Sequence, residues 1–302
     1  MGPTASGKTA LALAIAQHFQ GEVVSCDSVA VYRGMEIGTA KPTPAERVLV
    51  SHHLIDIANP GEPCTAGDYS RLARQAIAAI AVRRHLPVVT GGTGLYLRAL
   101  LDGLFAGPQR SEPLRERLRD RESARGAGWL HRILTRIDPA SAAHIHPHDQ
   151  PKLIRAIEVT LAGRRPQSEA WQQGRDPLTG YRILRLGLDP GRAALYARIN
   201  ARAAAMFEAG LVEETARLHA LYGDVAPLNS LGYRQARAVL NGQMKVAQAI
   251  AGASQGHRNY AKRQMTWFRR EPGVLWFEGF GDDAIVRSQA LARVAAELPS
   301  QL

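Results

Sequence analysis

The sequence predicts an α/β fold, in which a parallel sheet is flanked by helices and interrupted by a helical insertion domain. Three observations predict it. Short apolar runs alternate with amphipathic stretches before residue 109, a glycine-rich loop precedes the first of those stretches, and residues 110–182 contain no strand-like pattern. Such alternation is typical of parallel sheets covered on both faces. We therefore divide the chain into a first core segment (1–109), the insertion (110–182) and a second core segment (183–302).

The elements of the first core segment are predicted from periodicity. Apolar residues recur at helical spacing in residues 10–19 and 68–84, which predicts two helices. The short apolar runs at 22–26 and 87–90 are typical of buried strands. A further helix follows the second strand and extends through Leu101.

The remaining elements are predicted in the same way. Arginine, glutamate and histidine are dense in the insertion, which favours helices there. Residues 183–188 resemble a returning strand, helices are expected from 192 to 270, and residues 274–277 form a last strand.

Composition narrows the class of protein. Lys and Arg number 38 against 27 Asp and Glu, a net charge of +11 in 302 residues. This excess indicates either a polyanionic partner or a solvated arginine-rich surface. Cys26 and Cys64 are too few for a disulfide scaffold and fit a reducing cytoplasm. No apolar run approaches the roughly 20 residues that span a bilayer, so we expect a cytoplasmic protein without a membrane segment.

A phosphate-binding loop opens the sequence. The pattern G-x-x-x-x-G-K-[ST] is matched in full by Gly2, Pro3, Thr4, Ala5, Ser6, Gly7, Lys8 and Thr9. Backbone N–H groups of such a loop cradle phosphate oxygens at the start of a helix. Lys8 adds a positive charge, and the hydroxyl of Thr9 is a ligand for Mg²⁺. With this motif the predicted fold is P-loop NTPase-like. The motif indicates that the loop binds a phosphate group, but it indicates neither that the ligand is ATP nor that it is hydrolysed.

Two predicted strands end in polar residues, at the sheet edge where ligands bind in open α/β folds. The first delivers Asp27, which is a general base, an outer ligand of Mg²⁺ or a helix N-cap. The second is followed by Thr93, which contacts substrate or serves as a turn residue. Residues 88–90 lack the acidic metal ligand of many hydrolysing P-loop enzymes, which disfavours an ATPase or GTPase.

Eight strings in family order carry a resemblance that covers nearly the whole chain. They are GPTASGKT at 2–9, DSVAVYRGM at 27–35, IGTAKP at 37–42, HLID at 53–56, GGTGLY at 91–96, RAIEV at 155–159, GYRQ at 232–235 and KRQMTWFR at 262–269. With these strings the chain resembles the tRNA dimethylallyltransferases, also called tRNA isopentenyltransferases. The strings at 27–35 and 262–269 are the most specific to that family.

The resemblance implies a reaction. Dimethylallyl diphosphate donates its five-carbon group to the exocyclic amine of the adenosine 3′ of the tRNA anticodon, and diphosphate is released with Mg²⁺. The loop then holds a leaving group, which accounts for the missing acidic residue. Asp27 is implied as the base that accepts the amine proton, Thr93 as a contact to tRNA, and Lys8 as a charge that stabilises the departing diphosphate.

The resemblance also implies tRNA contacts. They fall on Asp27, Ser28, Val29, Ala30, Thr93, Arg115, Pro151, Lys152, Leu153, Ile154, Arg155, Asn229, Ser230, Leu231, Gly232, Tyr233, Arg234, Lys262, Arg263, Gln264, Met265, Thr266, Trp267, Phe268 and Arg269. The last eight lie in a predicted basic helix at 255–270, where Trp267 either stacks on a base or packs in the core. Pro151, Lys152 and Ala30 depart from the residues that the family often has. The insertion is expected to grip the anticodon stem-loop.

Two other readings stay open. The first is an ATP-dependent kinase for a small molecule or nucleotide, which shares the loop and an aspartate at a strand end. The second is an RNA-binding protein with a degenerate loop. Whether the loop also binds ATP is not determined by the motif. The family suggests a monomer.

The beginning of the sequence raises a separate expectation. A phosphate-binding loop normally follows a buried central strand, whereas here Met1 directly precedes Gly2. The first strand of the sheet is therefore missing from this sequence. We expect the natural protein to begin about 5–15 residues earlier, which suffices for one strand.

Overall fold

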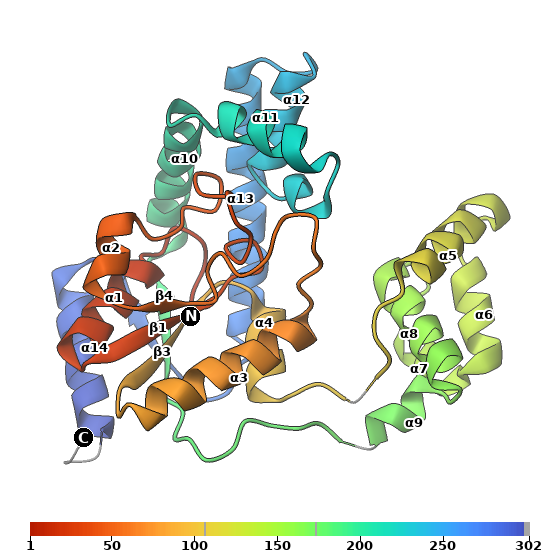
Figure 1. Ribbon diagram of the computed structural model, residues 1–302, viewed down its shortest axis with the longest axis horizontal. Helices are drawn as coiled ribbons and strands as arrows, with labels where there is room; N and C mark the ends of the chain where they lie inside the picture. Colours follow the sequence, from red (N-terminus) through yellow and green to blue (C-terminus); the bar gives the residue numbers. More distant parts are fainter. Residues whose placement is uncertain (106, 173, 299–302) are drawn as a thin grey trace. The chain divides into compact units, whose positions relative to one another are not determined.

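The computed structural model describes residues 1–105, 107–172 and 174–298. Two compact units are present (Figure 1). One combines Met1–Leu101 with Thr179–Leu302, and the other is Asp102–Leu178. The insertion was predicted at 110–182. The second unit begins earlier, at Asp102, and ends earlier, at Leu178. It takes in the stretch from Asp102 onward, where Gly103 lies close to the backbone of Asp176 and Asp102 pairs with Arg175 at 3.9 Å.

Among the described residues of the first unit, five parallel strands form two sheets. The strands β1 (Gly21–Cys26), β2 (His52–His53) and β3 (Leu86–Gly91) are ordered β2-β1-β3, and β4 (Arg185–Asp189) pairs with β5 (Val274–Glu278). Val24 lies opposite Val89 of β3, and Leu188 lies opposite Phe277 of β5. The predicted sheet is thus parallel but divided into two hydrogen-bonded groups. Two-residue β2 has no sequence signal of its own.

Helices cover both faces of β1. The helix α1 (Lys8–His18) packs its alanines against Val23, while α3 (Ala66–Val82) brings Tyr69 to Cys26 on the other face. This alternation follows from the two-residue period of a strand. A cluster around Leu11, Leu188 and Val286 joins α1 to β4 and to α14 (Ala284–Glu297). Figure 1 shows α14 beside α1.

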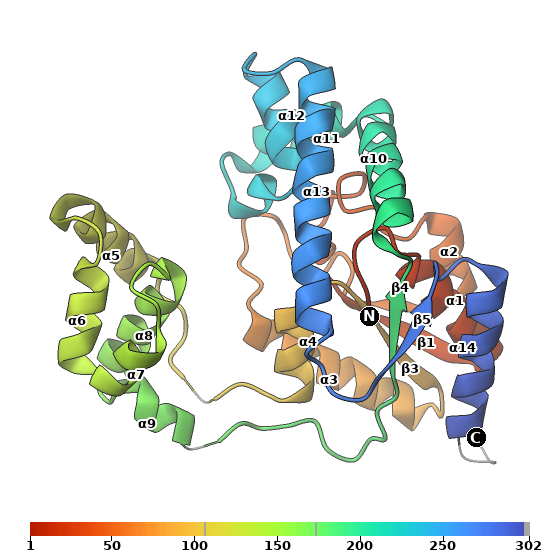
Figure 2. The same ribbon diagram turned by 180° about the vertical axis from the view of Figure 1, so that it is seen from behind.

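Longer helices follow β4 along the chain. They are α10 (Arg192–Glu208), α11 (Leu211–Tyr222), α12 (Tyr233–Leu240) and α13 (Val246–Phe268), with a 3₁₀ turn at Ala226–Asn229 before α12. Figure 2 shows α13 running alongside α10 and reaching α4 (Gly94–Leu101). We predicted the start of α13 at 255, nine residues too late. Within this helix Leu231 packs against Gly256, where an added Cβ would lie 2.6 Å from its Cδ2.

The loop after β1 carries the remaining short elements of the first unit. It includes α2 (Pro44–Leu49), which begins with a capping box formed by Thr43 and Glu46. The side chain of Lys41 is buried in this loop, where its Nζ donates to the carbonyl of Tyr32 at 2.6 Å and pairs with Asp56 at 2.5 Å. These contacts fix a segment that has little regular structure.

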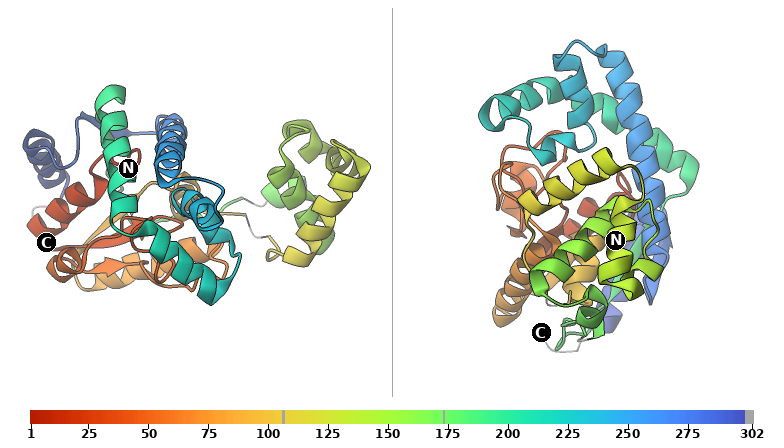
Figure 3. Two further views of the ribbon diagram at one scale, coloured as in Figure 1. Left: turned by 90° about the horizontal axis from the view of Figure 1, so that it is seen from above. Right: turned by 90° about the vertical axis from the view of Figure 1, so that its right-hand side faces the viewer.

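The second unit is helical, as the insertion was predicted to be. Its helices are α5 (Glu112–Arg125), α6 (Trp129–Ile137), α7 (Pro139–His144), α8 (Gln150–Gly163) and α9 (Gln167–Gln172). Figure 3 shows α5 to α8 side by side in its right panel. They enclose an apolar core of their own around Leu130, Leu134 and Ile157. None of the helices in the described part of the chain is both long and apolar enough to cross a bilayer.

Met1 lies beside β4 in the manner of a strand residue. Its amino group donates to the carbonyl of Leu186 at 2.6 Å, and its carbonyl accepts from Leu188 N–H at 3.1 Å. This pairing delivers Gly2 to the carboxyl end of β4, where the loop begins. The strand expected upstream of Met1 stays a prediction.

Candidate active site

The glycine-rich loop lies between Met1 and α1. Gly7 has a φ of 83°, and an added Cβ would come within 2.5 Å of Asp282 Oδ1, so only glycine fits there. Gly281 N–H donates to the carbonyl of Ser6 at 2.9 Å and holds the segment after β5 over the loop. The hydroxyl of Ser6 is buried and has no hydrogen-bond partner among the described residues. A buried hydroxyl without a partner, in a loop whose sequence matches a phosphate-binding motif, suits an anion.

Lys8 is the cation of the loop. Its Nζ donates to the carbonyl of Pro3 at 2.5 Å. Burial and the nearby charge of Arg202 lower the pKa of Lys8 to about 7, against the opposing pull of Asp27. The amine is therefore close to its own titration point near neutral pH, and a bound anion would favour its charged form.

Asp27 and Thr93 meet where β1 and β3 end. Oδ1 of Asp27 accepts from the N–H groups of Val29 at 2.8 Å and Ala30 at 3.1 Å, which fixes the carboxylate and engages one of its two oxygens. Thr93 Oγ1 accepts from Ser28 N–H at 3.0 Å, while Thr93 N–H donates to the carbonyl of Cys26 at 3.2 Å. The sequence predicted both residues at this edge, and the structure joins them through the turn at 26–30.

Gln264 connects the glycine-rich loop to the turn that follows β3. Its Oε1 accepts from Thr4 N–H at 2.7 Å and its Nε2 donates to the carbonyl of Gly92 at 2.8 Å. The side chain is buried, with 5% of its surface exposed. The tRNA contact predicted at Gln264 stays a prediction, and its amide is engaged by Thr4 and Gly92 in this structure. It ties α13 to the loop and to the turn after β3.

Three residues of the site, Arg202, Tyr260 and His257, were not predicted from the sequence. Arg202 on α10 donates to the carbonyl of Thr39 at 3.4 Å, and its charge influences Lys8. Tyr260 on α13 donates to the carbonyl of Gly92 at 3.3 Å. Burial and the charge of Arg202 lower the pKa of His257, one turn before Tyr260, to about 4, so its ring is neutral. An isolated arginine in the alanine-rich stretch 201–205 was the available signal for Arg202.

Comparisons with known proteins show the family to which the chain belongs. The model of the IPP transferase family matches residues 30–271, and that of the isopentenyl transferases matches residues 1–55. A tRNA dimethylallyltransferase of Koribacter versatilis is 65% identical over 96% of this chain and 95% of its own. One of Solibacter usitatus is 54% identical over 97% and 96%. The chain belongs to the IPP transferase family.

Solved structures agree with this assignment. The crystal structure of the full-length tRNA isopentenylpyrophosphate transferase from Bacillus halodurans has a TM-score of 0.71 and 37% identity, covering 98% of this chain and 94% of that chain. A eukaryotic dimethylallyltransferase acting on tRNA has a TM-score of 0.83 at 23% identity, over 100% of this chain and 79% of that chain, and supports the fold alone.

The tRNA contacts implied by the family resemblance differ widely in exposure. Those with exposed side chains are Pro151, Lys152, Asn229, Arg234, Lys262, Arg263, Thr266 and Arg269. The half-buried ones are Asp27, Ser28, Val29, Thr93, Arg115, Arg155, Ser230, Leu231, Met265 and Trp267. The buried ones are Ala30, Leu153, Ile154, Gly232, Tyr233, Gln264 and Phe268. The tRNA contacts stay a prediction for all three groups, and in the buried group a contact would have to use the backbone, since these residues are packed against the protein.

Arg115 and Arg155 of this IPP transferase family member lie in the second unit and share one carboxylate. Glu158 on α8 is fully buried and accepts from Arg115 at 2.8 and 3.0 Å, from Arg155 at 2.7 Å and from Ser111 N–H at 2.6 Å. Although burial opposes it, these bonds lower the pKa of Glu158 to about 2. Both guanidinium groups are thus held in position by Glu158. Either arginine could contact RNA only with the N–H groups that Glu158 leaves unused.

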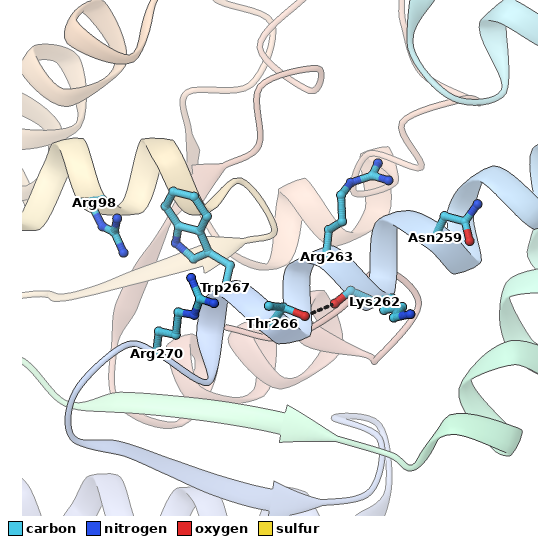
Figure 4. Close-up of a pocket in the computed structure, with 7 residues that line it drawn as sticks. All are labelled: Arg98, Asn259, Lys262, Arg263, Thr266, Trp267 and Arg270. Carbon is cyan, nitrogen blue, oxygen red and sulfur yellow. Dashed lines mark hydrogen bonds between the residues drawn. The ribbon is translucent and has the colours of Figure 1, made fainter. Parts of the chain in front are cut away.

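A basic groove lies between α4 and the outer face of α13, with a volume of about 460 Å³. Its lining residues are Arg98, Asn259, Lys262, Arg263, Thr266, Trp267 and Arg270 (Figure 4). The guanidinium of Arg98 lies 4.4 Å from the ring centroid of Trp267, and the ring packs against Gly94. Trp267 is thus half-buried: its ring packs against Gly94 and Arg98 but does not lie in the core. Arg269 faces elsewhere and pairs with Asp189 at 2.9 Å.

Proposed function

We propose that this protein transfers a dimethylallyl group from dimethylallyl diphosphate to the exocyclic amine of the adenosine 3′ of the anticodon in tRNA. The observation that carries the proposal is that Lys8, Arg202 and Asp27, two cations and a carboxylate, lie near enough for their charges to influence one another around the glycine-rich loop. Family membership supports the same reaction, since curated relatives are named for it. It disfavours the alternative of a kinase.

The residues suit a displacement at the donor carbon. The C–O bond to the diphosphate breaks as the C–N bond to adenine forms, and the amine proton passes to Asp27. Two hydrogen bonds hold that carboxylate in place to receive it. The diphosphate leaves with added negative charge, which Lys8 and Arg202 stabilise in a partly buried setting.

The residues present also fit a magnesium ion. Thr9 has an exposed side chain at the start of α1, and hydroxyl and phosphate oxygens are ligands that Mg²⁺ accepts. Among the described residues no cluster of His, Cys, Asp and Glu forms a separate metal site. We propose that Thr9 holds Mg²⁺ together with the donor phosphates. When bound, the ion would neutralise charge on the leaving group.

The basic groove supports RNA as the acceptor. Lys262, Arg263 and Arg270 offer charges for phosphates, and Trp267 offers a ring face next to Arg98. An adenine inside a stacked anticodon loop cannot reach a buried edge, so we propose that the base is flipped out of the stack. We propose further that the protein acts as a monomer in the cytoplasm.

One experiment tests the proposal. The protein is incubated with Mg²⁺, labelled dimethylallyl diphosphate and unmodified tRNA, and the RNA is examined for label. We expect label only when the target position is adenosine, and none with a transcript that has guanosine there. ATP consumption with a small acceptor would favour the kinase, and tRNA binding without label would favour a binding protein.

A further inference from the structure

A buried carboxylate on α11 accepts hydrogen bonds from four donors. Glu214 is 4% exposed, and its oxygens accept from the N–H groups of Glu36 at 3.2 Å, Ile37 at 3.1 Å and Gly38 at 3.4 Å, and from the hydroxyl of Tyr233 at 2.6 Å. Consecutive N–H groups that converge on one anion form a concave binding site for it. A buried carboxylate is costly unless it is satisfied in this way, so the arrangement fixes both partners.

The turn that Glu214 holds is packed on its other sides as well. The ring of Tyr233 lies so close to Gly38 that an added Cβ would come within 2.3 Å of it. Lys41 pairs with Glu36 at 3.0 Å, and thereby links the turn to the ion pairs of the loop after β1. The position of residues 36–39 therefore depends on Glu214, Tyr233 and Lys41 together.

This turn is also where Arg202 is anchored. Arg202 donates to the carbonyl of Thr39 at 3.4 Å. Thr39 is itself fixed within the turn, because its hydroxyl donates to the carbonyl of Met35 at 2.6 Å. Burial lowers the pKa of Arg202, while the carboxylate of Asp27 opposes the shift. A guanidinium that is partly buried needs fixed acceptors, and Thr39 is one of them.

We infer that Glu214 is a positioning residue, which orients Arg202 toward the diphosphate by holding the turn at 36–39. The inference rests on the proposed function, because it takes the diphosphate as the ligand of Arg202. Glu214 itself touches neither substrate. Its effect passes through the backbone of the turn, so removing its charge should act on the donor side of the reaction.

The test measures inorganic pyrophosphate binding by calorimetric titration with Mg²⁺, which needs no turnover. Glu214→Gln keeps the shape but turns an amide toward backbone N–H groups. We expect affinity to fall about tenfold, a size seen for coupled neighbours. In Glu214→Gln combined with Arg202→Lys, the loss should be smaller than the product of the single losses. The matched control is Glu213→Gln, which removes the same charge from an exposed neighbour on α11 and should leave affinity unchanged.

Several outcomes would overturn the inference. Glu214→Gln could lower the melting temperature yet bind pyrophosphate like the wild type, or the two losses could multiply in the double variant. Either result makes Glu214 a core residue only. If Glu214→Gln does not fold, Tyr233→Phe removes one donor from the same carboxylate, and unchanged affinity there rejects the inference. A wild type that binds pyrophosphate but labels no tRNA would contradict the proposed function and leave the inference standing.

Discussion

Lys8 shows how burial tunes a single charge. Its pKa near 7 means that the ligand-free protein loses this cation as the pH rises through neutrality. Above that point pyrophosphate must recharge the amine as it binds, and binding is weaker for that reason. The affinity for pyrophosphate should therefore depend on pH through the charge of Lys8.

We expect the contribution of Lys8 to pyrophosphate affinity to shrink between about pH 6 and about pH 8.5. Lys8→Met keeps the volume and removes the charge. Calorimetric titrations of both proteins across this range give the contribution as their difference, which cancels the ionisation of pyrophosphate itself. A difference that stays constant with pH would show that the amine remains charged throughout.

Asp27 is expected to act as the base without acting on binding. Asp27→Asn retains an oxygen that can accept from Val29 and Ala30, so the turn should keep its shape. Turnover should fall by roughly 10²-fold or more, the usual contribution of a general base. Steady-state kinetics should find both KM values little changed. Near-normal turnover in this variant would remove Asp27 from the role of base.

At the scale of the element, α13 has two functions on two faces. Its inner face carries Tyr260 and Gln264 to the turn after β3, and its outer face carries Lys262 and Arg263 into the basic groove. One helix thus connects the site for the donor with a surface suited to RNA. The two faces meet at one point, because the guanidinium of Arg263 lies 5.7 Å from the ring centroid of Tyr260.

A triple variant, Lys262→Ala, Arg263→Ala and Arg269→Ala, should raise the KM for tRNA and spare that for the prenyl donor. Phosphate contacts weaken with salt, so the salt dependence of tRNA binding should also become shallower. Arg269 should contribute least of the three, since it pairs with Asp189. Filter-binding titrations at several salt concentrations measure both effects.

The matched control removes three exposed arginines from elsewhere in the first unit, Arg84, Arg287 and Arg293. It lowers the net charge equally and should change tRNA affinity much less. Equal losses in the two triple variants would mean that overall charge, and not the basic groove, attracts RNA.

At the scale of the whole molecule, the chain forms two units with separate cores. Glu158 stabilises the second unit through Arg115 and Arg155. Its folded-state pKa, about 2, lies below its unfolded value near 4.5. This stabilisation is therefore complete above about pH 4.5 and is lost as the pH falls toward about 2.

Glu158→Gln should destabilise the second unit by roughly 1–3 kcal/mol near neutral pH, because two arginines lose a buried carboxylate. The difference from the wild type should shrink as the pH falls below about 4.5. Hydrogen exchange of amides in α5 and α8 measures the effect in this unit. Glu116→Gln, at an exposed position on α5, is the control. Equal protection in both variants would contradict the assigned stabilisation.

Much of the fold could be predicted from local patterns. The loop at 2–9, the strands β1, β3, β4 and β5 and the helix α3 follow from motif and periodicity. The helices α2 and α14 and the strand β2 were not predicted. Exposed Val48 and Leu49 on α2 and Ile285 on α14 obscure the apolar pattern, and β2 is too short to have one.

The site could be predicted only where a motif lies near it. Asp27 and Thr93 follow strands, so the sequence indicates their meeting. Arg202 and Glu214 act on a turn that lies more than 150 residues earlier in the chain. No local pattern encodes such a contact, and a lone arginine among alanines resembles any solvated helix residue. Similarly, the burial of Tyr233 and Gln264 is decided by the helices around them.

Trp267 has a practical consequence for work in solution. The sequence has four tryptophans, and this one lies in the basic groove beneath the guanidinium of Arg98. The emission of an indole depends on the charges and rings against it. A phosphate that draws Arg98 away, or a base that stacks in its place, would change the intrinsic fluorescence of the protein. The groove therefore carries its own optical reporter, by which tRNA could be titrated without any attached dye.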